Sequence, residues 1–373
     1  MGVFGLGPFI RSQEIDCEFV IELSSFSGTS WGIDSLNWIF RDVPITVKNI
    51  INTKANIFEP ITDDEIRRGV EKKMYFFNKK LADHGITPVW IWDGVSQGNK
   101  VLTQEERREK RRENLEKRKA LFEKLSEKDI LELTDEEIKK WKNSVCSSTG
   151  LSRESVGKLK TLTREFGIPT ITSDDEAENL AASLSVEKKI SLVWSNDTDN
   201  YPLGSTKVAS EFIYKEGKVY VKGIEPHKIV SHLGMDFRTF RDFCILMGTD
   251  FNKRIKGFGP TNNLKLLKKY GCLEKIDSDT KHNFSFINYP YVRKQLTPYS
   301  TYYQKEIHLC TKKCYDPDKL QDLKDKYPEL NVQSLISSLN DLCEDEESDS
   351  EESNSEESDS EETNHNSQKE TLH

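Results

Sequence analysis

Two short apolar runs that end in acidic residues constrain the fold of this chain more than any other feature. Residues 87–94 read Thr-Pro-Val-Trp-Ile-Trp-Asp-Gly, so that the run ends at Asp93. Residues 190–194 form a second apolar run, which is followed by Asp197 and Asp199. Short continuous apolar runs are typical of strands that are buried on both faces of a sheet. The sequence therefore predicts a buried, mostly parallel central sheet.

The segments around these runs extend the same pattern. Residues 31–40 read as the end of a strand at Asp34 that runs directly into a helix, and residues 64–84 have a helical pattern. Strands that alternate with helices are typical of an α/β fold in which helices flank a mostly parallel sheet. Ligands of such sheets bind beyond the carboxyl ends of the strands. Acids at several strand ends should therefore gather at one edge.

Acids gathered at one edge favour a metal site. Like charges a few ångströms apart repel unless a cation neutralises them, and carboxylate oxygens suit hard divalent metals. Each acid also has a simpler interpretation, as a helix cap or turn residue for Asp34 and Asp93, or as a capping box for Ser173 and Glu176. The candidate ligands are Asp34, Asp93, Glu176, Glu178, Asp197, Asp199 and Asp250.

The segment 103–127 is charged almost throughout. Residues 100–128 hold eleven basic and seven acidic residues, in a chain whose formal net charge is −9. Thr103 and Glu106 form a capping-box pattern, and the segment has little apolar stripe. We therefore expect a polar, basic helix that stands away from the core. The alternative is a solvated helix held by its own ion pairs.

The net charge of −9 combines two unlike parts. Residues 344–362 contain twelve acids and no Lys or Arg, and Lys369 and Glu370 cancel. Residues 1–343 therefore carry a formal charge of +3. The Ser- and Glu-rich segment 344–373 lacks aromatic residues and is expected to be a disordered acidic tail. The whole-chain charge thus does not exclude a nucleic-acid partner for the body.

The remaining composition indicates a compartment. Seven scattered cysteines suggest reduced thiols in an intracellular protein. No apolar run approaches the roughly 20 residues of a membrane helix. We therefore expect no membrane partner. The expected location is intracellular.

Several of these motifs together resemble the flap endonuclease family of structure-specific 5′ nucleases. They are Met-Gly-Val-Phe-Gly-Leu at residues 1–6, Gly-Ile-Asp-Ser at 32–35, Trp-Ile-Trp-Asp-Gly at 90–94, Gly-Ile-Pro at 167–169 with Asp-Asp-Glu-Ala-Glu at 174–178, Ser-Asn-Asp-Thr-Asp at 195–199, Gly-Thr-Asp-Phe at 248–251 and Ile-Lys-Gly-Phe-Gly-Pro at 255–260. The resemblance covers roughly residues 1–275 with the motifs in the family's order.

The resemblance implies a domain organisation. The fold would be PIN-like, with an N-terminal nuclease region at 1–97 and a basic helical arch at 98–150 inserted in the same domain. An internal nuclease region at 151–343 would contain a helix–two-turn–helix DNA-binding element at about 240–272. The tail at 344–373 would follow.

The resemblance also implies roles for individual residues. The seven acids would hold two Mg²⁺ ions, while Lys100 and Arg107 would bind the scissile phosphate as catalytic residues. Phe40 would stack on a base, where the family has Tyr. A K⁺ ion in the helix–two-turn–helix is a further expectation, and Asn263 stands there where the family usually has Ala. The residues expected to contact DNA are Gly2, Phe40, Arg108, Arg111, Arg112, Lys256, Gly257 and Gly259.

The resemblance implies that the partner is branched double-stranded DNA with a 5′ single-stranded flap, cut by a monomer. It also implies a location in the nucleus, or at a viral replication site if the chain is viral. Residues 333–340 have the Gln and the aliphatic of a sliding-clamp motif but no aromatic residues, so we doubt clamp binding through them. Two alternatives remain open. One is a nuclease of the same family that acts on bubbles, junctions or RNA. The other is a non-catalytic nucleic-acid-binding scaffold.

Overall fold

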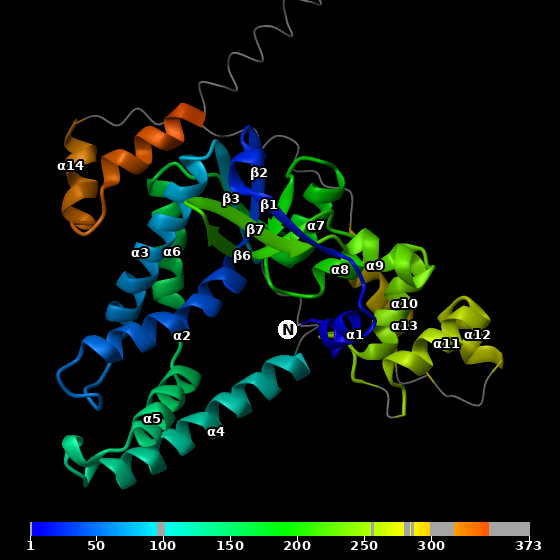
Figure 1. The fold of residues 1–373 in the computed structure, drawn as a ribbon, viewed down its shortest axis with the longest axis horizontal. Coiled ribbons are helices and arrows are strands. Elements are labelled where there is room, and N and C mark those ends of the chain that lie inside the picture. The colour runs from blue at the N-terminus through cyan, green and yellow to red at the C-terminus, as the bar shows by residue number, and fades with distance from the viewer. Residues whose placement is uncertain are drawn as a thin grey trace, which may run out of the picture.

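A single mixed sheet lies at the centre of the molecule (Figure 1). The computed structural model describes residues 2–94, 101–254, 257–279, 284, 287–298 and 317–342. Within these ranges the sheet has seven strands in the order β1-β7-β6-β5-β2-β3-β4. The strands are β1 Glu18–Glu22, β2 Thr29–Asp34, β3 Ile86–Trp92, β4 Thr170–Thr172, β5 Leu192–Trp194, β6 Val208–Lys215 and β7 Lys218–Ile224.

The pairing confirms the predicted α/β fold. Strands β6, β5, β2, β3 and β4 pair in parallel, and β7 runs antiparallel between β6 and β1. Strand β2 has β3 on one side and β5 on the other, so the chain order reverses there. A crevice at the carboxyl ends of strands at such a switch point is where open α/β sheets bind ligands. Asp34 is the last residue of β2.

Strand β3 shows why the apolar runs had to be interior strands. All of its residues are buried. Trp90 belongs to a large core cluster on one face, where the stacked rings of Trp31 and Trp194 lie 5.8 Å apart. Its neighbours Val89 and Ile91 pack on the other face with residues of α7 (Ala177–Val186). Because successive side chains of a strand point to opposite faces, a strand covered twice must be apolar throughout.

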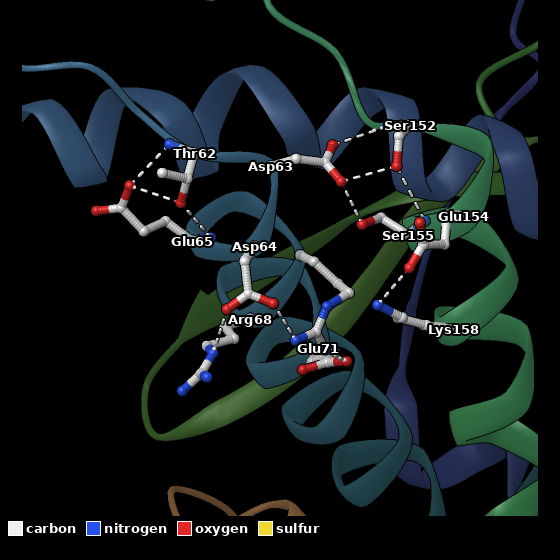
Figure 2. A network of polar contacts seen from close by, with 11 residues as sticks. Thr62, Asp63, Asp64, Glu65, Arg68, Glu71, Ser152, Glu154, Ser155 and Lys158 are labelled. Atoms are coloured by element: carbon white, nitrogen blue, oxygen red, sulfur yellow. Dashed lines mark hydrogen bonds and ion pairs between the residues drawn. The ribbon is translucent and has the colours of Figure 1, made fainter.

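Helices α2 (Ser35–Thr53), α3 (Asp63–Ala82) and α6 (Arg153–Glu165) contribute to the core cluster that contains Trp90. The helix predicted at 64–84 is thus present as α3, which begins with a capping box between Thr62 and Glu65. Asp63 joins α3 to the start of α6, as Figure 2 shows. Its carboxylate accepts hydrogen bonds from the Ser152 N–H at 2.8 Å and the Ser152 hydroxyl at 2.7 Å, and another from the Ser155 hydroxyl.

The basic segment forms one leg of a helical hairpin that projects from the body in Figure 1. The hairpin consists of α4 (Val101–Ser126), the short helix η2 (Ile130–Glu132) and α5 (Asp135–Ser148). The prediction of a helix standing away from the core holds for most of α4 but is wrong for its last turns. There Leu125 is buried, and the Phe122 ring lies 5.8 Å from the Trp141 ring of α5. The Trp141 indole N–H donates to the Ile57 carbonyl at 2.7 Å.

Replacing Trp141 with Ala should loosen the hairpin. Trp141 is 3% exposed, and its loss would leave a cavity and remove the bond to Ile57. We expect a loss of stability of roughly 2–4 kcal/mol, with faster amide hydrogen exchange in α5. Leu131→Ala at the tip of the hairpin is the control, since Leu131 is 93% exposed. Unchanged exchange in the Trp141 variant would show that other contacts hold this leg.

A second hydrophobic cluster supports the helices beside the sheet, and its helices gather on one side of the molecule in Figure 1. The ring of Phe9 in α1 lies 5.3 Å from that of Phe243 in α10, so the N-terminal helix packs on this group. The helices are α1 Leu6–Ser12, α8 Asn200–Leu203, α9 Pro226–Leu233, α10 Phe237–Met247, α11 Pro260–Tyr270, α12 Leu273–Asp279 and α13 Tyr289–Gln295; the remaining short helix, η1 Leu23–Phe26, joins β1 to β2.

The last described segment packs against α3 and α6. It consists of α14 (Pro317–Lys326) and a helix at 332–342. The Tyr75 hydroxyl donates to the Asn331 carbonyl at 3.0 Å, and the Tyr327 hydroxyl donates to the Glu165 carboxylate at 2.9 Å. The apolar residues of the segment considered for clamp binding, Leu335, Ile336 and Leu339, are buried in the core. The expected acidic tail at 344–373 lies outside the described residues.

Two further properties concern the environment of the chain. None of the helices in the described ranges is long and apolar enough to cross a membrane. The cysteines that these ranges contain, Cys17, Cys146, Cys244 and Cys272, are free thiols.

Candidate active site

Asp34 closes β2 and caps the helix that follows. Its Oδ1 accepts a hydrogen bond from the Asn37 N–H at 3.2 Å, which is a helix cap, as the simpler interpretation of this residue predicts. Its Oδ2 accepts a second bond from the Ser195 hydroxyl at 3.0 Å. Ser195 directly follows β5, so the second bond joins the ends of two neighbouring strands. Asp34 is 3% exposed and therefore presents a buried carboxylate at the switch point.

Asp93 joins the end of β3 to the start of α7. Its Oδ1 accepts a hydrogen bond from the Ala177 N–H at 2.8 Å. The Gly94 N–H donates to the Asp175 carbonyl at 2.8 Å, which brings the loop before α7 against the strand end. Glu176 is the residue before α7, and Glu178 lies in its first turn. Asp93 and the two candidate acids at the start of α7 therefore lie on directly bonded segments.

The capping box predicted for Ser173 and Glu176 is wrong. The Ser173 hydroxyl instead donates to the carbonyl of Glu176, at 3.1 Å, and the Glu176 side chain makes no cap bond. Asp93 takes the place of a local cap, because it accepts from the first N–H of α7. The physical reason is that a carboxylate from a neighbouring strand reaches this helix end, so the Glu176 carboxylate is not used to close it.

Asp197 and Asp199 follow β5 in a tight loop. The Asp197 N–H donates to the Ser195 hydroxyl oxygen at 3.1 Å, and Asp197 Oδ1 accepts from the Asp199 N–H at 3.1 Å. Both acids are 3% exposed. The N-terminus lies against this loop. A Cβ at Gly2 would come within 2.7 Å of the Asp199 nitrogen.

Asp250 lies in the turn that follows α10. The Gly248 carbonyl accepts a hydrogen bond from the Phe4 N–H at 2.9 Å. Phe4 is two residues from Gly2, which touches the 197–199 loop. The turn is held locally by the Thr249 hydroxyl, which donates to the Asn252 side chain at 2.8 Å. Asp250 is thus two residues from Gly248, which is bonded to the N-terminal segment that touches the 197–199 loop.

The Asp34 carboxyl is affected by the charges of acids at two other strand ends. Burial, followed by the negative charges of Asp93 and Asp197, raises the pKa of Asp34 to about 7 from its ordinary value of 3.8. Hydrogen bonds from Asn37 and Ser195 act in the opposite direction. A buried carboxyl that feels two more carboxylates is costly to ionise unless a cation accompanies it.

The donor chemistry fits a hard divalent cation. All seven candidate ligands offer carboxylate oxygens, the donors that such cations prefer. Within the described ranges, no three side chains of Asp, Glu, His or Cys stand close enough together to hold one ion. The raised pKa of the Asp34 carboxyl shows that positive charge would be stabilising here.

The basic residues expected to contact the substrate lie mainly on α4. The Arg112 guanidinium pairs with the Glu109 carboxylate at 3.0 Å and remains largely exposed, whereas Arg111 lies against Gly150 beyond the end of α5. Arg108 is exposed. Arg107 is part of α4, but the structure does not describe its side chain. Lys100 and Lys256 lie outside the described residues.

The remaining expected contacts are a ring and a turn. Phe40 on α2 has 40% of its surface exposed, so its ring is available for stacking. Gly257 has φ +86°, a conformation that favours glycine, and Gly259 directly precedes Pro260, the first residue of α11. Asn263 is fully buried, and its side-chain nitrogen and oxygen make no hydrogen bond. Close packing at this position is therefore retained, although with an unsatisfied amide.

Sequence reasoning missed Ser195, whose hydroxyl donates to Asp34 and accepts from the Asp197 N–H. Ser195 directly follows an apolar run and comes two residues before Asp197, and this position could have indicated a role in the site. It also missed Asn179, whose side-chain nitrogen donates to the Gln295 carbonyl at 3.2 Å. No local pattern marks that contact, because it joins α7 to a segment 116 residues away.

The chain is similar to several known proteins in sequence and in fold. Residues 167–250 match the XPG I-region family, and this stretch contains five of the seven acids, Glu176, Glu178, Asp197, Asp199 and Asp250. Flap endonuclease 1 of Brugia malayi is 31% identical over 205 residues, which are 54% of this chain and 51% of that protein. Flap endonuclease 1 of Trypanosoma brucei brucei is 31% identical over 275 residues, which are 74% of this chain and 66% of that protein.

The chain spans about half the length of several curated relatives that it matches. Among solved structures, flap endonuclease-1 from Methanococcus jannaschii aligns over 90% of this chain and 99% of its own, with a TM-score of 0.58 and 19% sequence identity. At that identity the likeness concerns the fold alone.

Proposed function

The chain belongs to the flap endonuclease family, and from that premise we propose that it is a structure-specific 5′ nuclease. It would hydrolyse a phosphodiester bond of branched DNA that carries a 5′ single-stranded flap, with both endonuclease and 5′–3′ exonuclease action. The observation that supports this most is the buried Asp34 carboxyl at the switch point. Its burial, together with the charges of Asp93 and Asp197 from two other strand ends, raises its pKa to about 7. Such a site suits a divalent cation.

The acids of this edge would hold two Mg²⁺ ions. When bound, divalent ions in such sites activate water and neutralise charge that develops on a phosphate. The chain's own residues orient the ligands. Ser195 fixes the Asp34 carboxylate by its hydroxyl hydrogen bond, and Asp93 fixes the first turn of α7, from which Glu178 extends. These hydrogen bonds pre-organise the carboxylates before the substrate arrives.

Other residues would bind the DNA. Lys100 and Arg107, at the start of the arch, would neutralise the scissile phosphate, and Phe40 would stack on a base. Arg108, Arg111 and Arg112 would attract the flap along α4. The turn at Gly257 and Gly259, with Lys256, would bind the duplex backbone without reading sequence, and a K⁺ ion there is part of the same proposal.

Cleavage assays on four DNA substrates test the function. Wild-type protein with Mg²⁺ should cut 5′-flap and pseudo-Y DNA at the branch. It should cut nicked DNA more slowly and leave Holliday junctions largely intact. The double variant Asp197→Ala/Asp199→Ala is the control and should cut none of them. Preference for four-way junctions would reject flap specificity, and absence of any Mg²⁺-dependent cleavage of branched DNA would favour the scaffold alternative.

Stabilisation by Mg²⁺ should depend on pH. In the cation-free folded protein the Asp34 carboxyl holds its proton up to a pKa of about 7, well above the unfolded value of 3.8. Ionisation therefore costs stability as pH rises through that range, and a cation offsets the cost above pH 7. Below pH 7 the proton competes with the cation, which should weaken Mg²⁺ binding about tenfold between pH 8 and pH 6.

The measurement is the shift of Tm with Mg²⁺ concentration at pH 6 and at pH 8. We expect a larger shift at pH 8. An equal shift at both values would mean that Mg²⁺ binding does not displace the Asp34 proton.

A further inference from the structure

Helix α13 packs on α10 and is hydrogen-bonded to α7, although it belongs to neither the matched region 167–250 nor the resemblance described above. The Asn179 side chain on α7 donates to the Gln295 carbonyl at 3.2 Å. Arg241 on α10 donates from Nε to the Leu296 carbonyl at 2.8 Å and to the Pro202 carbonyl at 3.0 Å. The end of α13 is thus fixed to α7, which begins beside Glu176, and to α8, which begins after Asp199.

The other side of α13 is fixed by an ion-pair network. Arg293 binds the buried Asp242 of α10 at 2.7 Å and Glu274 of α12 at 2.7 Å. Asp242 also accepts a hydrogen bond from the Leu273 N–H at 3.1 Å. A charge-assisted network of this kind holds a helix in one orientation more firmly than isolated contacts do. The network therefore fixes the orientation of α13 relative to α10 and α12.

Tyr291 of α13 has a hydroxyl group that contributes no hydrogen bond to the fold. It lies one helical turn before Gln295, on the same side of the helix. Its hydroxyl is buried and makes no hydrogen bond. Burial, followed by the charges of Asp175 and Glu176, raises the pKa of Tyr291. The phenol therefore stays protonated at neutral pH, as a donor near the acids before α7.

An unsatisfied buried hydroxyl costs stability, on the order of 1–3 kcal/mol, and a phenylalanine at position 291 would avoid that cost. The packing of the ring alone thus does not explain why residue 291 is a tyrosine. A hydroxyl donor beside a carboxylate is, however, what second-shell groups provide at metal sites, where they fix the orientation of a ligand.

We propose that Tyr291 is a positioning residue of the acidic site, and that its hydroxyl donates to the Glu176 carboxylate when a divalent cation occupies the site. The inference rests on the proposed function for the identity of the reaction, but it concerns cation binding first. With a cation bound, the Glu176 carboxylate would accept the hydrogen bond that the Tyr291 hydroxyl lacks. The helix α13 supplies the rigid support that this bond requires.

The test compares Tyr291→Phe with Tyr289→Phe on the same helix. Each variant loses one hydroxyl, but the Tyr289 ring lies over Arg293, on the side of α13 that carries the ion-pair network. Binding of Mn²⁺ without DNA is measured from the electron paramagnetic resonance signal of free Mn²⁺. The Mg²⁺ concentration for half-maximal flap cleavage, the Kd for DNA in Ca²⁺ and the Tm are measured beside it.

We expect Tyr291→Phe to weaken Mn²⁺ binding about tenfold and to raise the Mg²⁺ requirement by a similar factor. Its DNA affinity should stay within about twofold of wild type and its cation-free Tm should be unchanged or higher. Tyr289→Phe should match wild type in Mn²⁺ binding. Equal Mn²⁺ affinities in both variants would overturn the proposal, as would a lowered Tm with parallel losses of Mn²⁺ and DNA binding.

The two proposals fail in different ways. If wild-type protein binds Mn²⁺ but cuts no branched DNA, the nuclease proposal fails, while a weaker Mn²⁺ affinity of Tyr291→Phe would still support the positioning role. If wild-type protein binds no Mn²⁺ at all, there is no cation for Glu176 to meet and the positioning role is rejected.

Discussion

Replacing Asp34 with Asn should abolish divalent-dependent cleavage and at the same time stabilise the cation-free protein at pH 8. Asn keeps an oxygen that can accept from the Asn37 N–H, and its amide can donate to the Ser195 hydroxyl. The fold should therefore survive. The charge is lost, however, and a cation would lose a ligand at the switch point. We expect cleavage to fall by roughly 10²–10³-fold or more.

The gain in stability follows from the pKa of the Asp34 carboxyl. A shift from 3.8 to about 7 means that ionisation in the cation-free fold costs on the order of a few kcal/mol at pH 8. Asn cannot ionise, so that cost disappears. Denaturant unfolding with EDTA should show the gain at pH 8 and a smaller one at pH 6, where the Asp34 carboxyl is mostly protonated.

Asp16→Asn is the matched control, because it removes the same charge from an exposed position before β1. It should change neither cleavage nor the pH dependence of stability. Cleavage by Asp34→Asn within tenfold of wild type would exclude Asp34 from the site. A lower stability of this variant at pH 8 would contradict the raised pKa of the wild-type carboxyl.

The sequence predicted those strands of the sheet that form a continuous apolar run. The run that ends at Asp93 is buried over the whole of β3 and is apolar from Pro88 onward, because both faces of this strand are covered. The antiparallel pair β6 and β7 was not predicted. Its turn consists of Glu216 and Gly217, both with positive φ, between strands rich in β-branched and aromatic residues. That hairpin signal is local and could have been read from the sequence.

The site was predictable as a set of acids but not as an arrangement. A local rule assigned Glu176 to a capping box with Ser173, yet Asp93, 84 residues from Ala177, accepts the helix N–H instead. The role proposed for Tyr291 could not be predicted from the sequence for the same reason. Its hydroxyl has meaning only beside an acidic loop that is more than a hundred residues away in the sequence. Contacts of this kind depend on topology, which residue spacing does not encode.

Replacing Gly2 with Ala should cause the second large loss of activity. Gly2 has φ +93°, and a Cβ there would lie 2.7 Å from the Thr198 hydroxyl oxygen and closer still to an Asp197 carboxylate oxygen. The chain cannot easily retreat, because the Phe4 N–H is bonded to the Gly248 carbonyl and α1 is packed on the core. The 197–199 loop must then shift. Displacing catalytic groups by about 1 Å can cost roughly 10²-fold in rate.

Gly5→Ala separates this clash from the backbone cost. Gly5 also has positive φ, +69°, but a Cβ there would meet only the Met247 methyl group, at an ordinary 3.6 Å. Both variants should lose about 1–2 kcal/mol of stability from the left-handed conformation. Only Gly2→Ala should lose about 10²-fold in single-turnover cleavage and bind Mn²⁺ more weakly. Equal losses of cleavage in the two variants would attribute the effect to the N-terminal backbone, and not to contact of residue 2 with the acidic loop.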